Sequence, residues 1–343
     1  YSPGVAGDTD VYGDLVFGRW NGSEVEWEIV DGAPSGPITN DPEGWRGGVS
    51  DPGDDVGRWS SMVEIEGTFL IAYYDADAGA LKLAAGGPGA WEAHAIDEAG
   101  DSGRYASLAL TGDGVPTVAY LRMEESEEAP GTIRSAVMVA TANLANPEDA
   151  SDWTVEEVAG GPMDCRPALC PLGATCLESG ACVMPTSDCS DECGADQVCF
   201  EGSCEAALPD PYIEDVPPAI GLYTSLAATP GGGLGLVYYD RSSGNVFGVA
   251  SDGGGWGAPF LIDGYGRSDE DPSVGDSGMS ADLVVDADGV WHVAYVDGAQ
   301  ETLRYARVAP DGTVERREEV DDGSTSDGST RFSDGRHIVG DDA

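Results

Sequence analysis

The sequence predicts an all-β fold, a β-propeller of about five or more four-stranded antiparallel blades with incomplete terminal blades. Three observations predict it. A unit of about 45–55 residues recurs along the chain, and each copy holds four short runs rich in Val, Ile, Leu, Tyr and Trp, separated by Gly, Asp, Pro and Ser. No segment combines helical periodicity with helix caps, so almost no helix is expected. One cysteine-rich segment interrupts the repeat.

The four complete units follow one another along the chain. They span residues 56–97, 103–158, 221–263 and 275–321, and the last unit is the loosest. The second run of a unit is continuously apolar, as in Leu70-Ile71-Ala72, which is typical of a strand packed on both faces. The fourth run alternates, as in Val25-Glu26-Trp27-Glu28-Ile29, which is typical of a half-solvated outer edge. A β-sandwich would also contain many short strands, but it would not repeat the same Tyr-Asp and Trp positions at one pitch.

The two ends of the chain match only parts of a unit. Residues 14–17 and 25–31 match the third and fourth strands of a preceding unit, and residues 339–341 match the start of a following unit. An unpaired sheet edge promotes association. We therefore expect that either a longer polypeptide or strands of a partner chain complete these blades, and self-assembly is one consequence.

All eight cysteines lie in one segment and form two similar halves. They are spaced Cys165-x4-Cys170-x5-Cys176-x5-Cys182 and Cys189-x3-Cys193-x5-Cys199-x4-Cys204. An even number at short spacing predicts disulfides and an oxidising compartment, without fixing the pairing. Zinc is disfavoured because the segment contains no C-x2-C pair and no His, and haem because C-x-x-C-H is absent. The predicted organisation is blades over 1–161, a disulfide-rich insert over 162–218 and further blades over 219–343.

The charge excludes several classes of partner. The chain carries 63 acidic and 16 basic residues, a net charge of −47, which disfavours nucleic acids and anionic membranes. No apolar stretch is long enough to span a membrane, and no nucleotide-binding motif is expected. The chain shows no signal peptide, yet its cysteines predict an extracellular or cell-envelope location, so we expect a processed or partial chain.

One face of the predicted disc gathers the variable loops. The link between a fourth strand and the next first strand is short at 98–102, is long at 32–55 and 322–338, and carries the cysteine insert. The hairpin between the second and third strands emerges on the same face. Loops on a rigid scaffold are where binding usually resides, so we expect a glycan or protein ligand there. The candidates for this binding face are Tyr74, Tyr239, Asp240 and Asp297.

Calcium is the candidate cofactor. Asp75 with Asp77, and Asp286 with Asp288, lie in oxygen-rich loops flanked by glycine, which suit a hard cation. Aspartate is also a common turn residue, so a purely structural role for each pair stays open.

The recurring Gly-x-Tyr-x-Ser-Leu, Ala-Tyr-Tyr-Asp and Trp…Ile-Asp patterns resemble repeats of secreted bacterial propellers related to the sialidase-type BNR repeats. The Asp box of sialidases is not matched, because residues 251–256 read Ser-Asp-Gly-Gly-Gly-Trp. The half from Cys189 to Cys204 resembles four-cysteine modules of extracellular proteins of myxobacteria. These resemblances imply an envelope or extracellular protein and transfer no catalytic residue.

The expected function is a non-catalytic extracellular or cell-surface scaffold for binding or adhesion, assisted by calcium. A structural subunit of a surface filament is one alternative. A divergent glycan-processing hydrolase is the other, since carboxylates are abundant and Arg58, Arg104 and Arg267 lie at or near unit starts. The sequence contains no catalytic motif, so it predicts that the protein is not an enzyme.

Overall fold

The computed structural model describes residues 13–39, 45–163, 174–177, 179–189, 193–194, 197–207, 217–264, 276–298, 300 and 302–322. Within these ranges the chain is almost entirely β. Its helical content is two short 3-10 turns, η1 (Trp45–Gly48) and η2 (Ala150–Asp152). None of the described helices is both long and apolar enough to cross a membrane.

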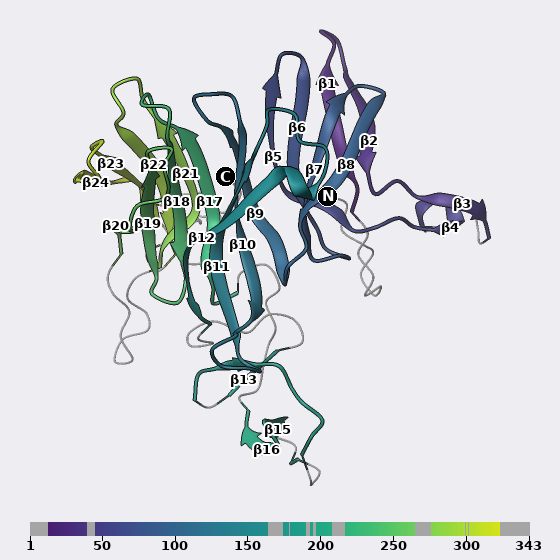
Figure 1. The fold of residues 1–343 in the computed structure, drawn as a ribbon, viewed down its shortest axis with the longest axis vertical. Coiled ribbons are helices and arrows are strands. Elements are labelled where there is room, and N and C mark those ends of the chain that lie inside the picture. The colour runs from purple at the N-terminus through teal and green to yellow at the C-terminus, as the bar shows by residue number, and fades with distance from the viewer. Residues whose placement is uncertain are drawn as a thin grey trace, which may run out of the picture.

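Four antiparallel sheets of four strands form the body, and in each the spatial order follows the chain. The first full blade is β5 (Val56–Ile65), β6 (Thr68–Asp75), β7 (Ala80–Gly87) and β8 (Ala90–Asp97); the second is β9 (Asp101–Leu110), β10 (Pro116–Glu125), β11 (Ile133–Ala142) and β12 (Trp153–Pro162). The third is β17 (Ile220–Ala228), β18 (Leu234–Asp240), β19 (Asn245–Ser251) and β20 (Phe260–Asp263); the fourth is β21 (Ser277–Val285), β22 (Trp291–Asp297), β23 (Thr302–Val308) and β24 (Val314–Asp321). Figure 1 shows these sheets side by side.

A half-blade precedes them. It is the hairpin of β1 (Leu15–Trp20) and β2 (Val25–Asp31), and a small sheet of β3 (Ser35–Ile38) and β4 (Val49–Asp51) follows it. The predicted all-β propeller of four-stranded blades, with an incomplete first blade, is confirmed. The second incomplete unit, residues 339–341, lies outside the described residues.

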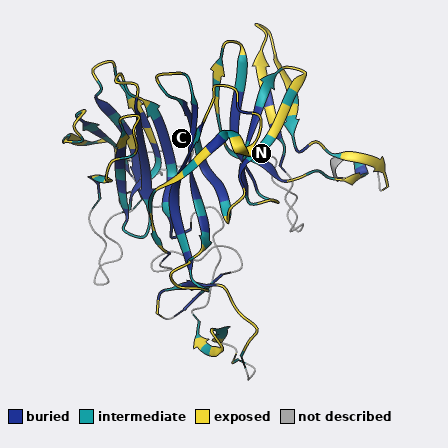
Figure 2. Cartoon of the chain, in the orientation of Figure 1, coloured by how far each residue is buried: buried dark blue, intermediate teal, exposed yellow. Residues whose placement is uncertain are grey.

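Burial follows the position of each strand in its blade. The second strands are the most buried, as the pattern of β6 and β10 shows, whereas the fourth strands β8 and β24 are largely exposed. Figure 2 shows this gradient as dark blue inner strands and yellow outer strands. First strands of successive blades lie against one another, β5 on β9, β9 on β17 and β17 on β21.

Close packing of a first strand on the preceding blade requires glycine at one position. Gly103, in β9, has a φ of 111°, and a Cβ there would lie 2.8 Å from the Cα of Leu81 in the preceding blade. Gly57, in β5, has a φ of 95°, and a Cβ there would lie 2.9 Å from the Cα of Leu15. The repeated glycine is therefore needed for both backbone conformation and blade spacing.

A serine in the first strand links each blade to the next. Its hydroxyl oxygen accepts a hydrogen bond from a backbone N–H of the following first strand. The pairs are Ser61 with Leu108, Ser107 with Leu226, and Ser225 with Leu283, each at 3.0 Å. These bonds satisfy backbone N–H groups on the inner edge of a blade, where no neighbouring strand can pair with them.

The repeated tyrosine and the Ile-Asp motif together form an inter-blade contact. The tyrosine of a second strand donates to the aspartate that ends the fourth strand of the preceding blade. The donor–acceptor pairs are Tyr73 with Asp31 at 2.5 Å, Tyr120 with Asp97 at 2.6 Å, and Tyr295 with Asp263 at 2.5 Å. A cation completes each contact: Lys82 on Asp31, Arg122 on Asp97 and Arg304 on Asp263. We call this arrangement the Tyr–Asp clasp.

The clasp lowers the pKa of two of its aspartates, Asp97 and Asp31. Burial alone would raise the pKa of Asp97, but hydrogen bonds from Arg122 and Tyr120 outweigh it and the pKa is lowered. Asp31 behaves in the same way with Lys82 and Tyr73. The buried Asp97 and the half-buried Asp31 are thus each compensated by a cation and a hydroxyl.

The cysteine insert leaves the propeller after β12 and returns at β17. Its first hairpin, β13 (Thr175–Cys176) and β14 (Cys182–Val183), docks on the β10–β11 hairpin: Val183 bridges Thr132, and the N–H of Met184 donates to the carbonyl of Gly131 at 3.0 Å. The second hairpin, β15 (Gln197–Phe200) and β16 (Ser203–Ala206), lies farther out (Figure 1).

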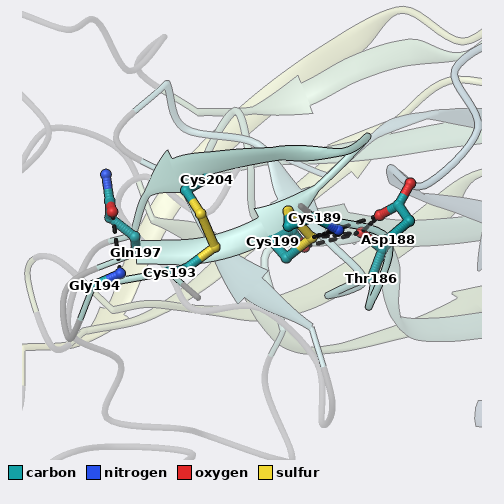
Figure 3. Close-up of a disulfide and its surroundings, with 8 residues drawn as sticks. All are labelled: Thr186, Asp188, Cys189, Cys193, Gly194, Gln197, Cys199 and Cys204. Carbon is teal, nitrogen blue, oxygen red and sulfur yellow. Dashed lines mark hydrogen bonds between the residues drawn. A yellow bond between two sulfur atoms is a disulfide. The ribbon is translucent and has the colours of Figure 1, made fainter. Parts of the chain in front are cut away.

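Disulfides hold the insert together, as predicted. Cys189 bonds Cys199 and Cys193 bonds Cys204, on either side of β15 (Figure 3). Cys176 and Cys182 are disulfide-bonded as well. Cys165 and Cys170 lie outside the described residues. Because the clustered sulfurs of Cys189, Cys193 and Cys204 belong to disulfides, they are not metal ligands.

Candidate functional site

A β-bulge interrupts the first strand of every full blade at the same position. In β5, Ser61 pairs with Ala72 and Arg58 with Tyr74, so Trp59 and Ser60 together face the single residue Tyr73. The residues with left-handed backbone at this position are Trp59 (φ 50°), Tyr105 (φ 55°), Tyr223 (φ 49°) and Ser280 (φ 49°). A bulge re-aims a side chain, and strained non-glycine residues concentrate at functional sites.

The bulges bring three aromatic side chains from successive blades into contact. The ring centroids of Trp59 and Tyr105 lie 4.8 Å apart, and those of Tyr105 and Tyr223 also 4.8 Å apart. Tyr74 extends the group, with its ring 5.4 Å from that of Trp59. We call Trp59, Tyr74, Tyr105 and Tyr223 the axial aromatic cluster, because it joins the innermost strands of three blades.

Two aspartate–arginine pairs flank this cluster, and each lies at the start of a first strand. Asp55 is bound by Arg58 at 2.8 Å, and Asp101 by Arg104 at 3.0 Å. The guanidinium of Arg104 also lies over the rings of Trp59 and Tyr74, at 5.6 and 5.2 Å. The site therefore combines aromatic faces with two oriented carboxylates.

The carboxylates differ in their surroundings. Asp55 is buried and accepts the N–H of Gly13 at 2.8 Å; burial raises its pKa despite the neighbouring Arg58. Asp101 is more accessible, with 30% of its side chain exposed, and it accepts the hydroxyl of Tyr74 at 2.7 Å. Burial thus raises the pKa of one carboxyl, whereas a cation and a hydroxyl orient the other.

Asp54, which precedes Asp55 in the chain, is a further carboxyl with a raised pKa. Burial raises its pKa, and the nearby carboxylates Asp75 and Asp77 raise it further. Asp77 in turn accepts the N–H of Asp55 at 2.8 Å. The β6–β7 hairpin and the link before β5 therefore meet on the same face.

The residues predicted for calcium lie in two separate places. Asp75 is buried, accepts the N–H of Ala78 at 2.9 Å and lies 3.3 Å from Lys82. At the opposite ends of the strands, Asp286 accepts the N–H groups of Asp288 and Val290 in the β21–β22 turn.

Among the described residues, no three carboxylates bring their oxygens within 4.8 Å of one another. Calcium binding stays a prediction.

The residues predicted for the binding face also have internal partners. Asp240 accepts the N–H of Ser242 at 3.0 Å, and Asp297 is fully buried and lies 3.3 Å from Arg304. Tyr239 donates to Asp276, which precedes β21, just as Tyr74 donates to Asp101. Of the predicted residues, Tyr74 belongs to the axial aromatic cluster, and the ring of Tyr239 lies 6.4 Å from that of Tyr223 in the same cluster.

Sequence reasoning missed the roles of Asp55, Asp101, Trp59, Tyr105 and Tyr223. The recurring Gly-x-Tyr/Trp pattern was visible, but only the register of the first strand against the second reveals that a bulge turns these side chains toward neighbouring blades.

No protein-family model and no curated protein matches the chain. Solved structures do. An α-L-arabinanase of Penicillium chrysogenum complexed with arabinobiose has 11% identity and a TM-score of 0.44, over 79% of this chain and 67% of that one. An endo-1,4-beta-xylanase of Bacteroides thetaiotaomicron has 13% identity and a TM-score of 0.37, over 74% and 73%. A GH62 α-L-arabinofuranosidase catalytic domain of Coprinopsis cinerea has 10% identity and a TM-score of 0.37, over 87% and 75%.

These comparisons correct the expected function. The predictions of a non-catalytic scaffold and of no enzymatic activity find no support among them, since the neighbours of known function are glycoside hydrolases and a polysaccharide lyase. The alternative of a glycan-processing hydrolase is the better supported one. At these identities the likeness concerns the fold, so an activity has to be argued from this chain's own residues.

Proposed function

We propose that the chain is a glycan-processing hydrolase whose active centre is the axial aromatic cluster with its two flanking aspartates. The observation that carries the proposal is the placement of Asp55 and Asp101 at equivalent positions of adjacent blades, each paired with an arginine and each four residues before an aromatic residue of the cluster, Trp59 or Tyr105. Glycoside hydrolysis requires a pair of carboxyl groups in different protonation states, beside a surface that holds the sugar.

The two carboxyls have different roles in this proposal. Asp55, whose pKa burial raises, supplies the proton to the leaving oxygen of the glycosidic bond. Asp101, oriented by Arg104 and Tyr74, is the second carboxyl of the pair. The rings of Trp59 and Tyr223 offer apolar faces to the C–H groups of a sugar.

Release of reducing ends from a panel of neutral polysaccharides tests the proposal. We expect the oxidised protein to release oligosaccharides from at least one of them, and Asp101→Asn to lower that rate by at least about a hundredfold. Asp113→Asn is the matched control, because Asp113 is an exposed aspartate in the turn at the far end of the same blade. If the wild-type protein cleaves nothing, or Asp101→Asn cleaves normally, the proposal is wrong.

We further propose that the protein works outside the cell. The disulfides of the insert support an oxidising compartment. The resemblance to sialidase-type repeats and to myxobacterial four-cysteine modules stays a prediction, as does self-assembly. Calcium is proposed as a stabilising ion: CaCl2 should raise the thermal unfolding midpoint more than NaCl of equal ionic strength.

A further inference from the structure

A large cleft lies between the third and fourth full blades, far from the axial aromatic cluster. Its volume is about 730 Å³, and its walls come from the β17–β18, β21–β22 and β23–β24 hairpins and from the connection between β19 and β20. These connections lie at the opposite ends of the strands from the start of β5 and β9, because the strands are antiparallel. The volume falls within the range of sites for small ligands, roughly 300–1,000 Å³.

Glycine keeps this cleft open. A Cβ added at Gly231 or at Gly255 would meet no atom within 4 Å. At these two positions the wall of the cleft therefore consists of peptide groups rather than side chains. The backbone N–H and C=O groups are hydrogen-bonding groups that a polyhydroxylated ligand can use.

Trp256 provides an aromatic face and an unused donor in the cleft. Each full blade but the last carries a tryptophan in or just before its fourth strand, and two of these donate to the preceding blade: Trp91 to Glu28 at 2.9 Å and Trp153 to His94 at 3.4 Å. Trp256 is half-buried, and no group in the described part of the chain accepts its indole N–H. Trp256 packs against the core of the third blade, so the exposed part of its ring and its N–H are what the cleft offers to a ligand.

The charges of the cleft select the ligand. Asp252 and Asp288 are the charged residues that line it, both are exposed, and no Lys or Arg is among the described lining residues. An acidic sugar would be repelled by these two carboxylates, and by the net charge of −47. A neutral sugar can both stack on Trp256 and donate its hydroxyls to the carboxylates.

We propose that this cleft is a second glycan-binding site, which holds a neutral oligosaccharide against Trp256. This second site rests on the proposed function only in assuming that the protein encounters glycans, and it requires no catalytic activity. Smaller clefts of about 460 and 120 Å³ lie between the preceding blades and contain Trp91 and Trp27. The larger cleft is the one whose volume suits an oligosaccharide and whose tryptophan is half-buried with no acceptor for its N–H among the described residues.

Calorimetric titration of the full oxidised chain carrying Asp101→Asn tests this site without cleavage of the probe. The probes are cellotetraose, xylotetraose and mannotetraose, with tetragalacturonic acid as the acidic counterpart. We expect at least one neutral probe to bind, and adding Trp256→Ala to weaken it about tenfold, the usual loss when a buried aromatic contact is removed. Trp20→Ala, on the exposed Trp20 of β1, should change nothing.

A second variant separates lost contacts from lost folding. Gly231→Leu fills the cleft at a position with ordinary backbone and open space, and it should weaken the same probe while the thermal unfolding midpoint stays unchanged. The proposal is overturned if no neutral probe binds, or if Trp256→Ala and Gly231→Leu bind as tightly as their parent. Reducing-end release by Trp256→Ala with Asp101 intact reports separately on the axial site.

Discussion

At the scale of single residues, the repeated tyrosines act as connectors between blades. The two tyrosines of one pair point to opposite neighbours, since Tyr73 donates to Asp31 of the preceding blade and Tyr74 to Asp101 of the following one. The sequence showed the repetition of these residues but not their partners. Those partners are 42 and 27 residues away, and only the arrangement of blades brings them together.

Removal of one clasp hydroxyl should destabilise the fold. Tyr120→Phe leaves the buried Asp97 with one charge-assisted donor fewer, so we expect a loss of about 2 kcal/mol in the free energy of unfolding by urea. Tyr238→Phe is the control: Tyr238 occupies the same position in the third blade, where none of the described aspartates accepts its hydroxyl, and its ring stacks on Phe247. Equal losses in the two variants would contradict the clasp.

The clasp also predicts a dependence on pH. The pKa of Asp97 is lowered in the folded state, so its contribution is present above the ordinary aspartate pKa of about 4 and is lost as pH falls through the lowered value. The gap in unfolding free energy between wild type and Asp97→Asn should therefore be widest at neutral pH and shrink in acid. A gap that widens in acid would contradict the lowered pKa of Asp97 in the folded state.

At the scale of elements, the blade repeat could be predicted because the residue pattern of a strand is local. For example, the second strand of the first full blade was expected near Leu70, which lies in β6 (Thr68–Asp75). The cysteine-rich hairpins lie between β12 and β17, and the predicted bounds of the insert, 162–218, stay a prediction. The bulges could not be predicted, because a bulge depends on register between two strands. The small β3–β4 sheet was missed because Ser35–Ile38 is short and polar.

Glycine in the first strand provides a test at this scale. Gly103→Ala must place a Cβ 2.8 Å from a backbone atom of Leu81 and adopt a φ of 111°, so we expect a loss of at least about 3 kcal/mol in unfolding free energy. Gly114 also has a positive φ, 76°, but the space around an added Cβ is open. Gly114→Ala should therefore lower the unfolding free energy by only about 1 kcal/mol. Similar costs would show that blade spacing is not what this glycine controls.

At the scale of the whole molecule, the net charge of −47 opposes compact folding. Ionic strength of about 0.1 M screens exposed charges beyond about 10 Å, while the buried clasps are screened much less. We therefore expect the thermal unfolding midpoint to rise by several degrees as NaCl is added at neutral pH. A fall would mean that surface ion pairs outweigh the general repulsion.

The axial site, too, exists only at this scale, because Asp55 and Asp101 belong to different blades. The most direct test is a crystal structure of Asp101→Asn soaked with an oligosaccharide from a polysaccharide that the wild-type protein cleaves. The predicted result is a sugar ring against Trp59, with the scissile oxygen within hydrogen-bonding distance of Asp55. A sugar bound elsewhere, with the axial aromatic cluster empty, would contradict the proposed active centre.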